Sequence, residues 1–528
     1  MNRISEEFLK EGLALLEKYR AARLPLEARI RSDEEFLRLR HTPTGSAAAS
    51  DMPSPASSWL FSSITGKHAD MLERIPEPIC LAREESDEPA AELLSKIIPV
   101  ILDRCDFKRV YSELLYDKLK HGSGVYGVFW NPTLDSGLGD IELRRVELLN
   151  LYWEPGVSDI QDSENLFYVT SVSRAALEGR YPDAIRFEKP LGTLSCGDFE
   201  DGERVPVIDR YYKKYEGGKV KLCFVKFTPE CLIYSSEEEG DESFYHHGRY
   251  PFVFDTLYRE AGTPAGYGII SVTRGAQAYI DRLDENILEH SIMASKPRYM
   301  LKRNVGLDKN DFLDWNNPII EVDGDLGEER VRAVDTPKLD TSILEVRGSK
   351  IDEIKEASYT RDINYGTAAS NISSGVAIAA LQEAGDKNSR EIACESERAF
   401  ADAVALMIEL IRQFYDDGRI FRITAPNRRE YVRFSKASVR EQTFSLGGEL
   451  MCRLPVFDIE VRASKSSPFT RASHNETLTE LYRLGVFARE NRDAALILLD
   501  SLELDGKGEL IKQLKRAYPE RESEVSDK

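Results

Sequence analysis

The sequence predicts an α+β protein, in which long helices and short strands occupy different stretches of the chain. Apolar residues recur at three- and four-residue spacing over residues 268–295, which is typical of a long helix. Residues 125–228 contain short segments rich in β-branched and aromatic residues, broken by Gly, Pro or Asp, which indicates strands. The chain has 528 residues, 41% of them hydrophobic, so it has the length of about three domains and can bury a large core.

The charge balance is acidic, with 71 Lys and Arg against 91 Asp and Glu and a net charge of −20. Tight binding of nucleic acid needs a cationic surface, so the composition disfavours it, whereas DNA that slides past is compatible. The 7 cysteines are scattered without C-x-x-C spacing, which indicates reduced thiols in the cytoplasm. The acidic, amphipathic start is unlike a signal peptide, and no stretch approaches ~18 consecutive apolar residues, so we expect no membrane span.

The chain begins with helical patterns. The helix expected over about residues 5–40 follows from apolar side chains at helical spacing, namely Leu9, Leu13, Leu16 and Tyr19. Residues 42–58 are mostly small residues and prolines, which cannot build a core, so we predict a mobile loop there. Further helical patterns cover about residues 59–74 and 89–121.

Residues 125–228 are predicted to form strands. They are expected over residues 125–130, 141–145, 166–173, 205–215 and 219–228. The last two should form a hairpin around Glu216-Gly217-Gly218, because glycine permits the positive φ angles of a tight turn. The acidic run 235–243 is predicted to be a solvated loop.

The second half is dominated by long helices. Residues 268–295 lack proline and would form a rod ~40 Å long, ended by Pro297. The segments that follow are a β-like insert to about 339, a helix over 342–364, a small-residue loop, a helix over 376–415 interrupted only by Gly385, strands over 420–434 and 456–463, and a helical end over 473–518. A single rod cannot bury its own apolar residues, so we expect neighbouring copies to cover the rods, for example in a closed ring.

The motifs that carry common chemistries are missing or misplaced. Gly122, Gly124 and Gly127 match G-x-G-x-x-G, but a helix precedes them and a strand follows, so Gly122 is predicted to cap the helix. His246 and His247 lack a third metal ligand at fixed spacing. The sequence also contains no P-loop, no H-E-x-x-H and no G-x-S-x-G. We therefore predict no catalytic, cofactor-binding or metal-binding residues, and a hydrolase built from scattered carboxylates stays an unsupported alternative.

A basic cluster follows the first rod, at Lys296, Arg298, Lys302 and Arg303. Cations near a helix carboxyl terminus are favoured by the helix dipole, which is the structural interpretation. The functional interpretation is contact with a passing polyanion.

Five stretches together resemble the portal proteins of tailed bacteriophages. Their order and spacing over roughly residues 55–520 carry the resemblance. The stretches are SWLFSSITGKHADMLERIPEP (58–78), GSGVYGVFWNP followed by GDIELRRVELLNLYWEPGVSDIQDSENLFYV (139–169), RYPFVF followed by GYGIISVTRGAQAYIDRLDENI (266–287), SSGVAIAALQEAGDK (373–387) and SKSSPFTRASHNETLTELYRLGVF (464–487). The helices before Thr42 match nothing recognisable in that family.

The resemblance implies the portal fold, with a β-rich wing, long stem helices, a small α/β clip, a long kinked helix and a helical crown. The implied domains are the N-terminal helices and wing (1–265), the first stem helix (266–296), the clip (297–339), the second stem helix (340–364), the tunnel loop (365–375), the long wing helix with returning strands (376–463) and the crown with the tail (464–528).

The resemblance also implies a function. About twelve copies would form a ring at one capsid vertex of the virion, after assembly in the host cytoplasm with major capsid and scaffolding proteins. Double-stranded DNA would pass through the channel during packaging and ejection, bound weakly and without sequence preference. The clip would bind the terminase large subunit and later a head-completion or adaptor protein. Another head–tail connector component is the alternative within the same class.

In the implied tunnel loop, five residues are candidates for contact with DNA, namely Gly366, Asn371, Ser373, Ser374 and Gly375. The two glycines bracket small residues that can shift, and the polar side chains offer neutral hydrogen bonds to phosphates. An ordinary mobile linker is the structural alternative.

Overall fold

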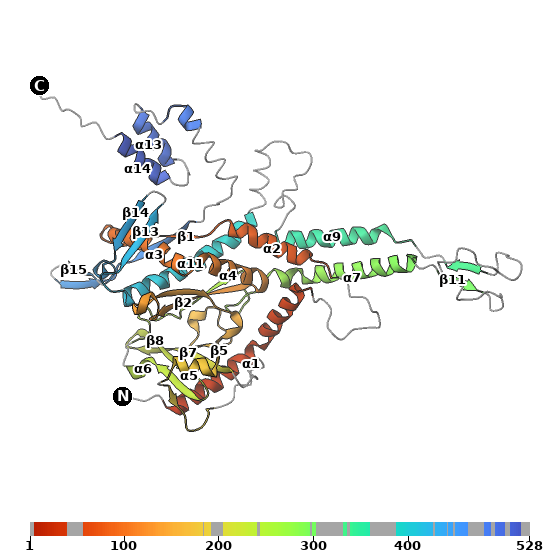
Figure 1. Ribbon diagram of the computed structural model, residues 1–528, viewed down its shortest axis with the longest axis horizontal. Helices are drawn as coiled ribbons and strands as arrows, with labels where there is room; N and C mark the ends of the chain where they lie inside the picture. Colours follow the sequence, from red (N-terminus) through yellow and green to blue (C-terminus); the bar gives the residue numbers. More distant parts are fainter. Residues whose placement is uncertain are drawn as a thin grey trace. The chain divides into compact units, whose positions relative to one another are not determined.

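The computed structural model divides the chain into two compact units. Unit 1 comprises Met1–Glu27, Lys67–Gly268 and Asp386–Lys528, and unit 2 comprises Ala28–Gly66 and Ile269–Gly385. The structure describes residues 5–39, 56–182, 184–191, 204–239, 243–295, 298–301, 331–334, 338–359, 387–425, 428–440, 442–446, 449–462, 480–486, 491–501 and 507–518. Helices and several separate sheets make up these residues, which confirms the α+β class (Figure 1).

The largest sheet of unit 1 has six strands in the order β4-β5-β7-β8-β9-β6, and every neighbouring pair is antiparallel. Its strands are β4 (Leu151–Trp153), β5 (Asn165–Ser173), β6 (Ile185–Arg186), β7 (Arg204–Glu216), β8 (Lys219–Phe227) and β9 (Cys231–Ser235), with the short helix α5 (Arg174–Arg180) after β5. The predicted hairpin is confirmed, because Gly217 and Gly218 join β7 to β8 with φ angles of 59° and 78°.

The first part of α1 (Glu6–Leu37) packs on this sheet. The predicted apolar stripe is buried: Leu9 is 0% and Leu16 1% exposed, and both belong to one cluster with Phe167 and Val225. The buried Arg210 guanidinium donates to the Phe8 carbonyl oxygen at 3.2 Å. This stretch of α1 is therefore an integral part of unit 1.

A second sheet, in the order β10-β2-β3, packs against two helices. Its elements are β2 (Ser123–Asn131), β3 (Asp140–Arg145), β10 (Phe252–Thr256), α4 (Phe107–His121) and α11 (Lys387–Phe414). The single helical stretch predicted over 89–121 is wrong at one point. The chain breaks it into α3 (Glu88–Arg104) and α4, because Asp106 adopts a left-handed conformation with φ 53°. The short polar side chain of aspartate tolerates that region better than most side chains do.

The acidic run after β9 is not simply a solvated loop. Residues Ser236–Glu239 form the short helix α6. The Glu237 carboxylate accepts a hydrogen bond from the Tyr212 hydroxyl at 2.6 Å and lies 2.5 Å from the Lys214 ammonium. Strand β7 supplies both partners, so this part of the run is tied to the sheet.

The remaining elements of unit 1 are two-stranded sheets and helices. They are α2 (Trp59–Leu72, shared with unit 2), β1 (Glu77–Ala82) paired with β17 (Phe457–Arg462), β13 (Ile420–Ala425) paired with β14 (Arg428–Arg433), β15 (Gln442–Leu446) paired with β16 (Glu449–Arg453), and α13 (Arg492–Ser501) packed on α14 (Lys507–Ala517). The strands predicted over 420–434 and 456–463 are confirmed, whereas β1 was not expected from its local pattern.

Unit 2 is built on two long helices, α7 (Ile269–Ser295) and α9 (Thr341–Ala357). The chain between them contains β11 (Arg298–Leu301) paired antiparallel with β12 (Val331–Val334), which agrees with the β-like insert. The second helix was predicted too long. It ends at Ala357, because Tyr359 adopts a left-handed conformation with a φ of 56°, which a continuing helix cannot contain.

Candidate functional site: the paired helices α7 and α9

The two long helices of unit 2 lie side by side (Figure 1), and a narrow apolar seam joins them. The buried residues of this seam are Ala276 and Ile280 of α7 and Ile351 and Ile354 of α9, and Trp59 packs against them. Ile280 and Ile354 are both 0% exposed. The seam joins the helices but covers only one stripe of each, so most of both surfaces faces outward.

An ion pair fixes the position of α9 along α7. The Arg347 guanidinium donates through Nε to Asp284 Oδ1 and through Nη2 to Asp284 Oδ2, the second bond being 3.3 Å long. The hydrogen bond to Asp284 raises the pKa of Arg347. Two-point contacts of this kind are directional, so they constrain register more than a single lysine contact would.

A buried glutamine anchors the start of α2 on α7. The Gln277 side-chain amide donates to the Ser57 carbonyl oxygen at 3.1 Å, and its oxygen accepts from the Leu60 N–H at 3.2 Å. Asp281, one turn further along α7, accepts from the Ser57 N–H at 3.0 Å. These bonds satisfy backbone groups that a helix amino terminus leaves without intrahelical partners.

The end of α1 also contacts α7. Arg274 Nη1 lies 3.8 Å from Asp33 Oδ1, and the guanidinium lies over the Phe36 ring at 5.0 Å from its centroid. At the far end of the pair, the Asp340 carboxylate accepts from the Ser342 N–H at 3.1 Å, which caps α9 and lowers the pKa of Asp340.

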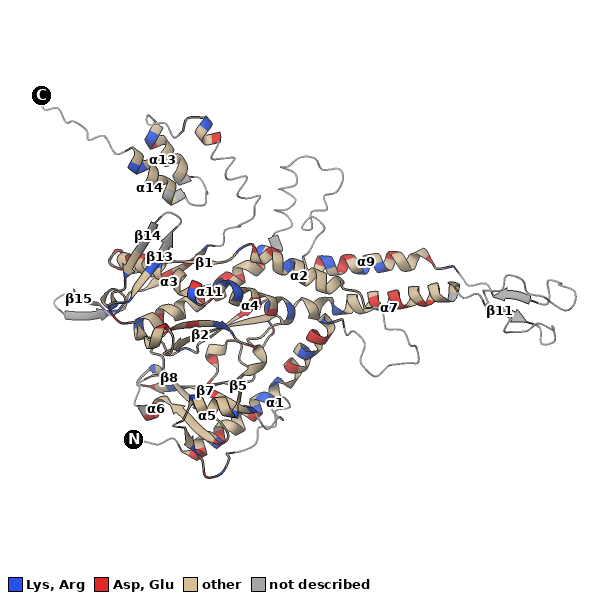
Figure 2. Cartoon of the chain, viewed as in Figure 1, with Lys and Arg blue, Asp and Glu red and all other residues tan. Residues whose placement is uncertain are grey.

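The outward surface mixes apolar side chains with charges. Large apolar side chains that are half-exposed or more are Val272, Tyr279 and Leu288 on α7 and Leu344 and Val346 on α9. Figure 2 shows cations and carboxylates interspersed along both helices, where α7 carries four carboxylates and two arginines. Such a surface offers contact area for other proteins, with charges that set orientation.

The structure describes little of the predicted site residues. Gly366, Asn371, Ser373, Ser374 and Gly375 lie outside the described residues, and so do Lys296, Lys302 and Arg303. Arg298 begins β11, where its backbone pairs with Val334. Sequence reasoning missed Gln277, Asp281 and Asp284, although their spacing of four and three residues places them along one face of a predicted helix.

Gly122 of the glycine motif caps α4 in a left-handed conformation, as predicted. Gly122 follows α4 with a φ of 93°, and a Cβ atom there would lie 2.2 Å from the Tyr267 carbonyl carbon. A Cβ atom on Gly268 would lie 2.1 Å from the Lys120 carbonyl oxygen. Both positions therefore need glycine, and the motif lies between helix α4 and strand β2, the reverse of the strand-to-helix order of a dinucleotide fingerprint.

The paired histidines contact protein groups. His247 Nδ1 accepts from the Arg249 N–H at 3.0 Å, and the ring stacks on Tyr245. Among the described residues, no three or more His, Cys, Asp or Glu side chains gather to hold a metal ion. The described helices also include none with the length and apolar character needed to cross a membrane.

Comparison with protein families places the chain among the phage portal proteins. The matching model is that of the Phage P22-like portal protein family, it covers residues 69–527, and the chain belongs to this family. The resemblance noted from the sequence is thereby confirmed. Membership makes the chain a structural component of a phage virion that assembles with further copies and with capsid components. A comparison with curated proteins found no match.

Proposed function

We propose that about twelve copies of this chain form a ring at one capsid vertex, around a channel for packaging and ejection of the genome. The clip, residues 297–339, binds the terminase large subunit during packaging and a head-completion or adaptor protein afterwards. Residues 365–375 face the DNA as a tunnel loop.

The outward surface of the helix pair carries this proposal. A pair held by one narrow seam leaves Tyr279 64% exposed and Val272, Leu288, Leu344 and Val346 each about half-exposed. Apolar side chains at such spacing along two long helices are covered most economically by neighbouring copies of the same pair. A closed ring covers both sides of every pair.

The charge of the chain supports weak contact with DNA. Duplex DNA carries one negative charge per ~1.7 Å, and a cationic wall would bind it by counterion release. Helix α9 has four carboxylates against three cations, and the whole chain has a net charge of −20. A lining of this composition permits sliding and gives no sequence preference.

Charge and shape also bear on the alternatives. A groove of about 500 Å³ in unit 1 contains Asp402, whose pKa is raised by burial, and could be taken for a hydrolase site. Another carboxylate of the groove, Glu395, is paired with Arg259 at 3.1 Å and with Arg398 at 2.5 Å. No observation therefore favours a hydrolase, and the family is structural.

The proposed ring is tested by electron microscopy of the purified protein and by measurement of its mass in solution. We expect negative-stain images of rings with a central hole wide enough for duplex DNA, and a mass near twelve times that of the 59.8 kDa chain. Tyr279→Glu should prevent rings, whereas Tyr215→Glu, at an equally exposed tyrosine in a hairpin of unit 1, should not. A chain that stays monomeric both alone and with scaffolding protein would overturn the proposal.

The channel roles are tested by packaging. Gly375→Pro should stiffen the tunnel loop and reduce DNA packaging while rings still form. Charge reversal of Arg298 together with Lys302 should impair motor docking or DNA passage. Filled heads at wild-type yield in either variant would remove the corresponding residues from the mechanism.

A further inference from the structure

Two fully buried lysines contact α11 in unit 1. Lys67 of α2 and Lys118 of α4 are each 0% exposed, and each bonds to a serine of α11. Lysine is almost never fully buried unless it is paired. The function proposed above uses neither residue.

The Lys118 ammonium is completely satisfied. It lies 2.5 Å from Asp255 Oδ1, 2.7 Å from Ser396 Oγ and 3.2 Å from the Ile392 carbonyl oxygen. These three acceptors match the three N–H donors of an ammonium. Strand β10 supplies Asp255, so the lysine connects α4, β10 and α11.

Ser396 closes the network. Its hydroxyl accepts from Lys118 and donates to Asp255 Oδ2 at 2.7 Å, so the three side chains bond to one another in a triangle. Removing an ammonium and a carboxylate from water is costly, and well-packed apolar replacements of such a pair are often as stable. A fully hydrogen-bonded polar network does, however, restrict the packed helices to the one arrangement in which every buried polar group has its partner.

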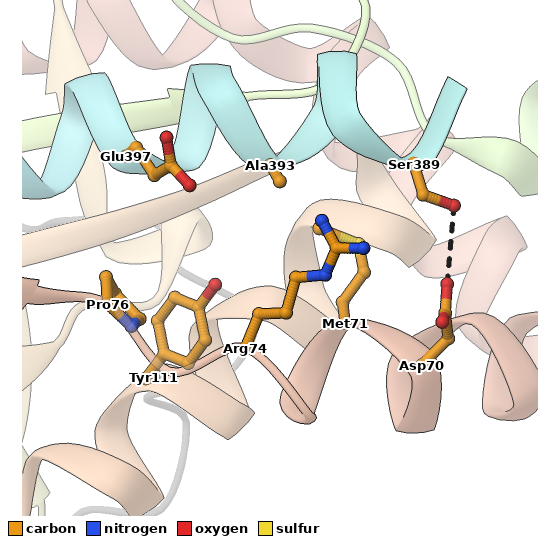
Figure 3. Close-up of a pocket in the computed structure, with 8 residues that line it drawn as sticks. All are labelled: Asp70, Met71, Arg74, Pro76, Tyr111, Ser389, Ala393 and Glu397. Atoms are coloured by element: carbon orange, nitrogen blue, oxygen red, sulfur yellow. Dashed lines mark hydrogen bonds between the residues drawn. The ribbon is translucent and has the colours of Figure 1, made fainter. Parts of the chain in front are cut away.

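The second contact lies at the start of α11. Lys67 bonds to Ser389 Oγ. Ser389 Oγ in turn donates to Asp70 Oδ2 at 3.3 Å, as Figure 3 shows. A cavity of about 10 Å³ beside it has room for one water molecule. Its polar lining includes Arg74 and Glu397, shown in the same figure.

The spacing of Ser389 and Ser396 shows how the network can fix the axial position of α11. Seven residues are nearly two helical turns, so Ser389 and Ser396 lie on one face of α11, about 10 Å apart along its axis. A slide by one turn would bring Ile392 or Phe400 against the buried charges in place of Ser396. The charged groups would then lose their partners, which is strongly unfavourable.

We propose that Lys118, Asp255 and Ser396, together with Lys67 and Ser389, form a register lock that holds the amino-terminal turns of α11 in one axial and rotational position within unit 1. The lock opposes both sliding of α11 along its axis and rotation of α11 about it. Any effect of the lock on a DNA-facing tunnel loop rests on the proposed function, whereas the lock itself does not.

The test is hydrogen exchange on the full-length protein, with or without ring formation and without DNA. In Ser389→Ala/Ser396→Ala we expect at least fivefold faster exchange over residues 390–400, against less than twofold over 405–414. Cys394→Ala is the matched control, because Cys394 lies on α11 but is exposed. Ser389→Thr/Ser396→Thr keeps both hydroxyls and should restore wild-type exchange.

Two results would overturn the lock. One is unchanged exchange over 390–400 in the alanine pair. The other is equal acceleration throughout unit 1, which would mean that the serines contribute only general stability. Because the readout needs neither packaging nor a ring, failure of the proposed function would leave it interpretable.

Discussion

Replacing His247 with asparagine should make folding of the protein less sensitive to acid. The imidazole packs against Tyr245 and accepts a hydrogen bond from the Arg249 N–H. Burial, followed by repulsion from Arg249, His246 and Lys213, lowers the pKa of His247 from 6.5 to about 3. The folded protein therefore keeps this ring neutral at a pH where the unfolded chain protonates it.

The sign and size of the effect follow from linkage. Above pH ~6.5 both states hold a neutral ring, and His247 costs no stability. As the pH falls below that value, only the unfolded state gains a proton, and unfolding becomes easier by about 1.4 kcal/mol per pH unit. The loss reaches about 2 kcal/mol at pH 5 and levels off below the folded pKa; partial exposure of the ring reduces it toward about 1 kcal/mol.

The assay is urea unfolding at pH 7 and pH 5. Asparagine retains a side-chain oxygen that can accept the Arg249 N–H but does not titrate. His247→Asn should lose about 1–2 kcal/mol less stability than wild type between the two pH values, and His246→Asn, at an exposed histidine, should behave like wild type. Equal acid-induced losses in wild type and His247→Asn would refute the reasoning.

Three further substitutions test packing by denaturant unfolding and hydrogen exchange. Ile354→Ala leaves a cavity in the α7–α9 seam and should lower the free energy of unfolding of this region by about 2–5 kcal/mol. Leu344→Ala, at a half-exposed position, should lower it by under about 1 kcal/mol. Equal losses in the two variants would contradict the seam. Leu16→Ala should cost a similar 2–5 kcal/mol and speed exchange in the first half of α1, and unchanged exchange would mean that α1 is not held by this stripe. Gly122→Ala adds a clash with Tyr267 to left-handed strain and should exceed the roughly 1 kcal/mol expected for Gly217→Ala, whose Cβ meets open space.

Local patterns predicted the elements that depend on local chemistry. The paired glycines at Gly217 and Gly218 specify a hairpin, and the apolar repeat of α7 specifies a helix ended near Pro297. The break at Asp106 was not predicted, because neither glycine nor proline marks that position in the sequence. Strand β1 was missed because its partner β17 lies about 380 residues away.

The side-chain networks could not be predicted from the sequence, for a different reason. Periodicity treats a lysine or glutamine as an exposed position, whereas Lys118 and Gln277 are each 0% exposed and fully engaged. Their burial depends on Asp255 and Ser57, which are distant in sequence. Sequence indicates which helix face is polar, but the partner that makes burial tolerable comes only from the tertiary fold.

The location of the charge matters more for DNA passage than its total. Among the described residues the buried charges nearly balance, with five cations against six carboxylates: Arg23, Lys67, Lys118, Lys120 and Arg210 against Asp33, Asp87, Asp117, Asp140, Asp209 and Asp255. The net charge of −20 is therefore not absorbed by the interior. In the proposed ring, surface carboxylates repel the duplex within a Debye length of about 8–10 Å, and a DNA that touches the wall releases few counterions. The duplex would then be positioned in the channel by a few neutral hydrogen bonds or isolated cations. This is the role proposed for the tunnel loop and for Arg298.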